Sequence, residues 1–239
     1  MDGTVYAALA RQTGLQAEMD VIANNVANAS TTGFRRGGIV FSEFVKATGA
    51  ETDSLSLVRP GAFHIARDAG AMEQTGGAFD FAIDGEGFFQ IDVGGAVHLT
   101  RAGRFAPDAN GALATPDGNA LLDASGAPVV IPPGVGSVVL GSDGTLSADG
   151  APLAQLGVVR PVDPTDFQRA GSQLFRVEGA LEPVGESRMQ QGFLEGSNVN
   201  PVEEIARLIE VQRRYEAARA FLDRENDRVG QVIRTLGQN

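Results

Sequence analysis

Apolar residues near the start of the chain recur at the spacing of an α-helix. Steps of 4, 3 and 4 residues place one group on a single narrow helical face: Leu15, Met19, Ile22 and Val26. Val5 and Leu9 extend this stripe upstream. Residues 29–33, Ala-Ser-Thr-Thr-Gly, are of the types that end helices and form turns. The pattern therefore predicts an N-terminal helix that ends before Gly33.

A longer stripe lies near the end of the chain. Its first part has steps of 3, 4, 3 and 4: Leu208, Val211, Tyr215, Ala218 and Leu222. After a polar position at Glu225, the register resumes with Val229, Val232 and Leu236. Such a/d spacing over about four heptads is typical of a coiled coil.

The start of this second helix is marked by Asn200 and Pro201. Asn is a favoured N-cap, and Pro suits the first helical position because the N–H that it lacks would be unbonded there. Glu203 and Glu204 then fall in the first turn, where the helix dipole favours anions. We expect a helix of about 38 residues, about 57 Å long.

A narrow apolar stripe buries little surface unless a second stripe covers it. The N-terminal stripe is the natural partner of the C-terminal one. We therefore expect the two ends to pair as a coiled coil, antiparallel or otherwise, with copies from other subunits as further candidates.

The middle of the chain, about residues 70–195, has the pattern of a β structure. Turn-forming pairs that tolerate positive φ are frequent: Asn110-Gly111, Asp117-Gly118, Asp143-Gly144 and Asp149-Gly150. Short apolar runs lie around them, at residues 79–83, 87–91, 128–131 and 137–140. This predicts many short strands in a sandwich or barrel-like arrangement.

The predicted fold class is α+β, with long N- and C-terminal helices paired as a coiled coil and a central, mainly antiparallel β domain. Residues 1–33 and 197–239 would form a helical core domain, and residues 71–196 a β-rich outer domain. Residues 34–70 are Gly-rich and show no sustained period, so we expect an extended connector there.

Charge separates the ends from the middle. The net charge is −11, yet residues 1–40 hold three acids and three bases, and residues 201–239 hold seven of each. The middle therefore carries the whole net charge, and nucleic acid is an unsuitable partner for such a surface. No apolar run reaches the ~18 residues of a membrane span, and the N-terminus lacks a signal-peptide pattern, so we expect that the chain is not exported by a cleaved signal.

The sequence offers no catalytic, cofactor or metal site. There is no cysteine, and the two histidines, His64 and His98, lie on different segments. Gly85-Glu86-Gly87 lacks the rest of a dinucleotide fingerprint, and Asp108-Ala109-Asn110-Gly111 fails the calcium-loop pattern. Carboxylates are plentiful in the middle, but nothing singles out a glycosidase pair. We therefore expect no enzyme activity and no cofactor.

Four blocks, in this order, resemble the signatures of flagellar basal-body rod and hook proteins. They span nearly the whole chain: residues 23–35 (ANNVANASTTGFR), 84–89 (DGEGFF), 99–105 (LTRAGRF), and 194–204 (LEGSNVNPVEE) with 212–216 (QRRYE). Within the family, the opening Met1-Asp2, the short connector and Asn200-Pro201 are most similar to the proximal-rod type. The distal-rod type is the alternative.

The resemblance implies a structural subunit that self-assembles into a helical, torque-transmitting tube. Its partners would be neighbouring rod subunits, namely other proximal-rod proteins and the distal-rod protein, and the flagellar export apparatus. The chain would be made in the cytoplasm and assembled in the periplasmic rod of the basal body. A secreted β-module with oligomerising helices is the alternative from another class.

The predicted assembly residues lie on the two stripes and in the adjoining motifs. The stripe members are Leu15, Met19, Ile22, Val26, Leu208, Val211, Tyr215, Leu222, Val229, Val232 and Leu236, and the motif members are Asn24, Asn25, Asn28, Gly33, Phe34, Asn198 and Asn200. Asn24, Asn25 and Asn28 either bond to the C-terminal helix or to neighbouring subunits, or merely unwind the helix end. Gly33 and Phe34 are expected to form the exit turn and its apolar anchor.

Overall fold

The computed structural model describes residues 3–47, 54–163, 166–185 and 187–236. The chain divides into two compact units. The helical unit comprises residues 1–27, 36–66 and 200–239, and the β-rich unit comprises residues 28–35 and 67–199. The chain therefore crosses between the units four times.

Both terminal helices are present where the apolar spacing predicts them. Helix α1 spans Gly3–Ala27 and helix α2 spans Pro201–Leu236, with 36 residues. The Asn200 side-chain oxygen accepts bonds from the backbone N–H groups of Val202 (3.1 Å) and Glu203 (3.5 Å), and thereby caps α2. The predicted cap is confirmed.

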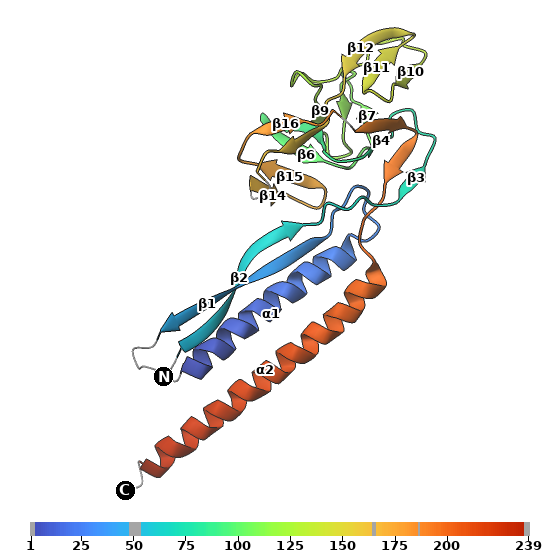
Figure 1. Ribbon diagram of the computed structural model, residues 1–239. Helices are drawn as coiled ribbons and strands as arrows, with labels where there is room; N and C mark the ends of the chain where they lie inside the picture. The colour runs from blue at the N-terminus through green and yellow to red at the C-terminus, as the bar shows by residue number, and fades with distance from the viewer. Residues whose placement is uncertain (1–2, 48–53, 164–165, 186, 237–239) are drawn as a thin grey trace. The chain divides into compact units, whose positions relative to one another are not determined.

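The two helices run antiparallel within the helical unit (Figure 1). Glu18 of α1 pairs with Arg207 of α2, and Asn25, further along α1, bonds to Glu204, which lies earlier on α2. One apolar cluster joins them, made of Leu15, Met19, Ile22 and Val26 from α1 with Leu208, Val211, Tyr215 and Ala218 from α2. We call this cluster the seam.

The segment expected to be an extended connector contains a long β-hairpin, which belongs to the helical unit. Strand β1 (Gly37–Ala47) pairs antiparallel with β2 (Ser54–Ile65), and both strands contact α1. The hairpin is hard to foresee because its stability rests on backbone bonds between residues far apart in the sequence. It also places the boundaries of this segment near residues 36 and 66, where 34 and 70 were expected.

A second face of α1, away from the seam, is also covered, and β1 and β2 are the strands that contact this helix. Small residues and one valine recur here with steps of 3, 4, 3 and 4: Ala7, Ala10, Gly14, Ala17 and Val21. All five are buried or half-buried, and the centre of this face lies about a third of a turn around the helix from the centre of the seam residues. Small side chains let the strand backbone approach the helix closely. The sequence analysis overlooked this face because it is weakly apolar.

The β-rich unit holds the remaining strands, which pair antiparallel. They are β3 (Met72–Gln74), β4 (Phe81–Asp84), β5 (Phe89–Val93), β6 (Ala96–Thr100), β7 (Ala106–Pro107), β8 (Leu113–Ala114), β9 (Ala120–Leu121), β10 (Val138–Leu140), β11 (Thr145–Ala148), β12 (Ala151–Gln155), β13 (Val159–Pro161), β14 (Phe167–Arg169), β15 (Leu174–Val177), β16 (Leu181–Pro183), β17 (Arg188–Gln191) and β18 (Phe193–Glu195). The α+β class with a central β region is confirmed.

The largest sheet has seven strands in the order β14-β15-β6-β5-β9-β8-β7, and the strands β10, β11 and β12 form a smaller meander. One apolar core lies among these strands, and its fully buried members include Phe81, Ile91, Leu113, Leu121 and Leu146. Most strands are short, so this core is assembled from one or two inward side chains per strand.

The four predicted turns are confirmed. Gly111, Gly118, Gly144 and Gly150 all have positive φ, between 83° and 88°. Of the four apolar runs, residues 128–131 form only isolated bridges to Leu122 and Ala112 and no named strand. The turn residues were easier to predict than the strands because a positive φ is a local requirement.

The backbone at Gly103 packs closely against the backbone of Phe81. A Cβ atom there would lie 1.6 Å from the Phe81 carbonyl oxygen, and the Gly103 carbonyl accepts the Phe81 N–H bond (2.9 Å). We predict that Gly103→Ala lowers the free energy of unfolding by about 1–3 kcal/mol or more. Gly185→Ala, at a position with no close neighbours, should change it by about 0.5 kcal/mol or less. Urea unfolding followed by circular dichroism measures both, and equal effects would contradict the prediction.

Candidate assembly interface and its polar anchors

The seam accounts for most of the predicted stripe residues. Ile22 and Val211 are 1% and 2% exposed, and Leu15 is 7% exposed. Met19, Val26, Leu208 and Tyr215 are partly buried and pack against these three. Each helix contributes one narrow strip, so the strips cover each other.

The seam covers only part of α2. Its last α2 member is Ala218, after which α2 continues for 18 residues to Leu236, whereas α1 continues for 12 residues from Leu15 back to Gly3. Leu222 is half-buried and Val229 is 48% exposed. The side chains of Val232 and Leu236 lie outside the described residues. The pairs Glu18–Arg207 and Asn25–Glu204 place Gly3 level with about residues 222–226, so α2 extends beyond α1 by about 15–21 Å.

Asn25 joins three elements at one end of the seam. It is 2% exposed, and its side-chain amide donates to the Gly37 carbonyl (2.9 Å) and accepts from the Gly37 N–H (2.9 Å), in the manner of a neighbouring strand. The same amide nitrogen donates to Glu204 of α2 (3.0 Å). Asn25 thus ties α1, β1 and α2 together.

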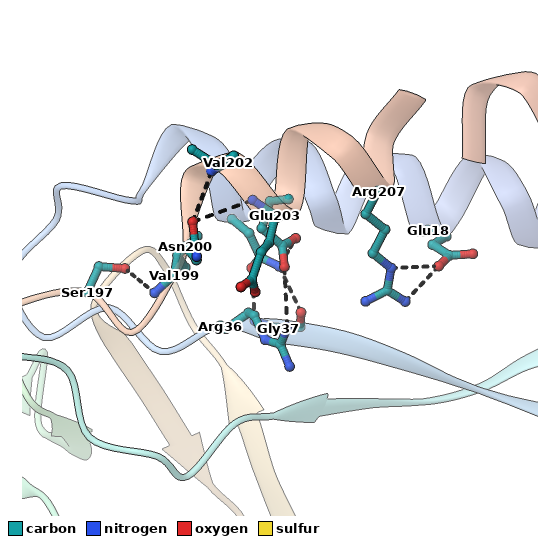
Figure 2. A network of polar contacts seen from close by, with 11 residues as sticks. Glu18, Arg36, Gly37, Ser197, Val199, Asn200, Val202, Glu203 and Arg207 are labelled. Carbon is teal, nitrogen blue, oxygen red and sulfur yellow. Dashed lines mark hydrogen bonds and ion pairs between the residues drawn. The ribbon is translucent and has the colours of Figure 1, made fainter. Parts of the chain in front are cut away.

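Glu204 is the acidic centre of this cluster, which Figure 2 shows from close by. It is 2% exposed and also pairs with Arg36 at 3.4 Å, whose side chain is 41% exposed. One turn further along α2, the Arg207 guanidinium donates to Glu18 of α1 at 2.7 and 3.2 Å. These bonds fix the register of the two helices, because a shift by one turn would leave Glu204 buried without partners.

The other predicted asparagines lie outside this cluster. Asn24 is exposed, and Asn28 lies in the turn after α1, where its side-chain oxygen accepts a bond from the Thr31 hydroxyl (3.2 Å). Asn198 is half-buried and donates to the Asp68 carbonyl (2.8 Å). Among the three asparagines near the N-terminal stripe, Asn25 bonds to Glu204 of the C-terminal helix.

Gly33 and Phe34 lie in the β-rich unit. Gly33 has a φ of +68°, and its N–H donates to the Glu195 carbonyl (2.7 Å). A Cβ atom at this position would lie 2.3 Å from the Ala102 nitrogen, so both conformation and space require glycine. Phe34 is fully buried, with the Arg169 guanidinium 4.5 Å from its ring centroid.

A buried charge cluster, which we call the Glu195 clamp, was not foreseen. Arg35 and Arg101 bond to opposite oxygens of the Glu195 carboxylate, at 2.7 and 3.0 Å. The Gly70 N–H also donates to that carboxylate (2.9 Å), and Arg35 donates to the Asp68 carbonyl. All three charged side chains are at most 3% exposed. The clamp therefore holds segments from four parts of the chain.

The charges of the clamp do not cancel. Burial, the largest cause, and the nearby Arg35 together lower the pKa of Arg101 to about 10, although Glu195 acts in the opposite direction and raises it. Arg101 also donates to the Ile83 (3.0 Å) and Gly85 (2.6 Å) carbonyls. The Nε atoms of Arg35 and Arg101 have no hydrogen-bond partner in the part of the chain that the structure describes. With two guanidinium groups against one carboxylate, the clamp depends strongly on Glu195.

No signal in the sequence pairs these three residues. Arg35 follows a turn, Arg101 follows β6, and Glu195 ends β18, so each resembles an ordinary exposed charge at the end of an element. Their convergence depends on the tertiary fold.

The described residues contain no group of three or more His, Asp or Glu side chains placed to hold a metal ion. The two histidines lie on β2 and β6, in different units. Within the described ranges, neither α1 nor α2 is long and apolar enough to cross a membrane.

Three family models match the chain, in order. Residues 6–35 match "Flagella basal body rod protein", residues 82–148 match "Flagellar hook protein FlgE/F/G D1 domain", and residues 190–234 match "Flagellar basal body rod FlgEFG protein C-terminal". One residue of the Glu195 clamp comes from each matched region. The class of protein is thus that of the flagellar rod and hook.

Individual proteins similar to the chain show which type of flagellar protein it is. The flagellar basal-body rod protein FlgF of Caulobacter vibrioides is 37% identical to the chain, over 100% of the chain and 99% of its own length. FlgF of Mesorhizobium japonicum is also 37% identical, over 99% of each protein. FlgG of Bacillus subtilis is 31% identical over 90% of the chain and 91% of its own length. The chain therefore belongs to the flagellar basal-body rod protein family, as a member of the FlgF type, and is a structural rod subunit. The resemblance seen in the sequence is confirmed.

The Glu195 clamp generates a prediction. Glu195→Gln keeps the side-chain shape but leaves two buried guanidinium groups without an anion, so we expect a loss of about 3–5 kcal/mol in the free energy of unfolding. Glu182→Gln removes one carboxylate from the exposed Arg160 pair and should cost at most about 1 kcal/mol. Urea unfolding of the two variants tests this, and similar midpoints would refute a structural role for the clamp.

Proposed function

We propose that the protein is a subunit of the proximal rod, in the periplasmic part of the basal body. It assembles there with neighbouring rod subunits, including other proximal-rod proteins and the distal-rod protein, after passage through the flagellar export apparatus. The assembled subunits form a helical tube that transmits torque by stiffness and without chemical turnover. Family membership and the greater identity to FlgF than to FlgG support this proposal.

The observation that carries the proposal is the incomplete burial of α2. A stripe in the register of the seam continues beyond α1, where Val229 is 48% exposed. Exposed apolar strips with helical spacing are typical of surfaces that another helix covers. The paired helices would therefore act as a coiled coil that neighbouring subunits complete.

The predicted assembly residues fall into two groups under this proposal. The seam residues and the cluster around Asn25 hold one subunit in the register needed for assembly, and the stripe from Leu222 onward meets neighbours. The β-rich unit would form the outer domain. Residues 41–200, most of which belong to this unit, carry the whole net charge of −11. Like charges on neighbouring subunits repel less when they lie at a larger radius of the tube.

The distal-rod position is the alternative within the family, and a secreted β-module with oligomerising helices is the alternative outside it. Cross-linking in isolated basal bodies separates all three. We expect adducts with proximal-rod proteins and with the distal-rod protein. Adducts with the distal-rod and hook proteins alone would place the chain in the distal rod, and absence from basal bodies would overturn the proposal.

Asn25 provides a genetic test of the assembly register. Asn25→Ala removes the bonds to Gly37 and Glu204, so we expect fewer rods and reduced swimming. Asn110→Ala, the same change at an exposed turn of the β-rich unit, should leave both unchanged. Swimming assays and counts of basal bodies measure the two effects. Normal rods in the Asn25→Ala strain would refute the register hypothesis.

A further inference from the structure

The outward face of α2 carries a second apolar strip near its start. Val202 is 75% exposed, and Ile205 and Ile209 are each 47% exposed. Their steps of 3 and 4 place them on one face. Val202 and the buried Val211 are nine residues apart, or about half a turn around the helix, so this strip points away from the seam.

The two uncovered strips of α2 are complementary in position. The first lies in the opening turns on the outward face, and the second, with Leu222 and Val229, lies on the seam side near the other end. Val202 and Val229 are 27 residues apart, about 180° around the helix. One copy can therefore present its first strip to the second strip of another copy lying alongside it.

Charge favours the same pairing. Residues 201–212 contain three acids and one base, whereas residues 213–236 contain six bases and four acids. Because Glu204 is buried and pairs with Arg36, the exposed side chains of the first segment are acidic by one charge, whereas the second segment is basic by two. If a second copy is displaced along the helix axis by about 30–36 Å, its acidic segment lies beside the basic segment of the first.

We propose that the strip formed by Val202, Ile205 and Ile209 docks on the Leu222–Val229 strip of a second copy of this chain, with the two α2 helices parallel and staggered. Because the two surfaces differ, each added copy leaves one of each uncovered. Such a head-to-tail contact generates an open, growing assembly. The inference rests on the proposed function and specifies one contact between copies in the rod.

The absence of cysteine in the chain allows a direct test. The full-length chain carrying both Ile205→Cys and Val229→Cys is co-expressed with the wild-type chain, so that rods form in every strain. Basal bodies are isolated and oxidised, and adducts are separated on a non-reducing gel. We expect dimers and a ladder of larger multiples of the chain mass.

Matched controls test whether cross-linking depends on the helix face that carries each cysteine. Each single variant, and the pair Ala217→Cys with Val229→Cys, should stay monomeric, since Ala217 is exposed but lies about 120° from Ile205. The pair Ile209→Cys with Val229→Cys should give the ladder again.

Three outcomes would overturn the proposal: no ladder from either pair in basal bodies that contain the variant, an equal ladder from the Ala217 control, or an adduct with a different protein. Failure of the proposed function is distinguishable, because the wild-type chain itself would then be missing from basal bodies.

Discussion

A helix with a narrow apolar strip cannot be stable by itself in water, and this constraint organises the helical unit. The strip of α1 covers that of α2 from Leu208 to Ala218, and the small-residue face of α1 receives the β1–β2 hairpin. Helix α1 is thus covered on two sides, whereas α2 is covered on one side and for part of its length. The burial that is missing from α2 is what makes this unit suited to assembly.

Buried polar groups determine the register of packed segments, which apolar strips alone do not specify. Leucine, isoleucine and valine strips could slide by one turn at a modest loss, but buried Glu204 would lose Asn25 and Arg36. The Glu195 clamp acts in the same way inside the β-rich unit, where it holds Arg35, Asp68, Gly70 and Arg101. In both clusters one carboxylate organises several chain segments, because a buried charge tolerates few alternative arrangements.

These features agree with a protein whose role is mechanical. The family is a structural one, and the buried charges of the described residues join separate chain segments. Arg35, Asp68 and Glu195 of the Glu195 clamp lie within five residues of three of the four points where the chain passes between the units.

The sequence by itself determined the elements that depend on local chemistry. Apolar spacing predicted both helices, Asn200 and Pro201 predicted the start of α2, and the Asn-Gly and Asp-Gly pairs predicted four turns with positive φ. Only the tertiary structure decided the hairpin in residues 37–65, the role of Asn25 and the Glu195 clamp. Each of these depends on partners 7 to 179 residues apart, and neither periodicity nor residue type shows which groups a fold brings together.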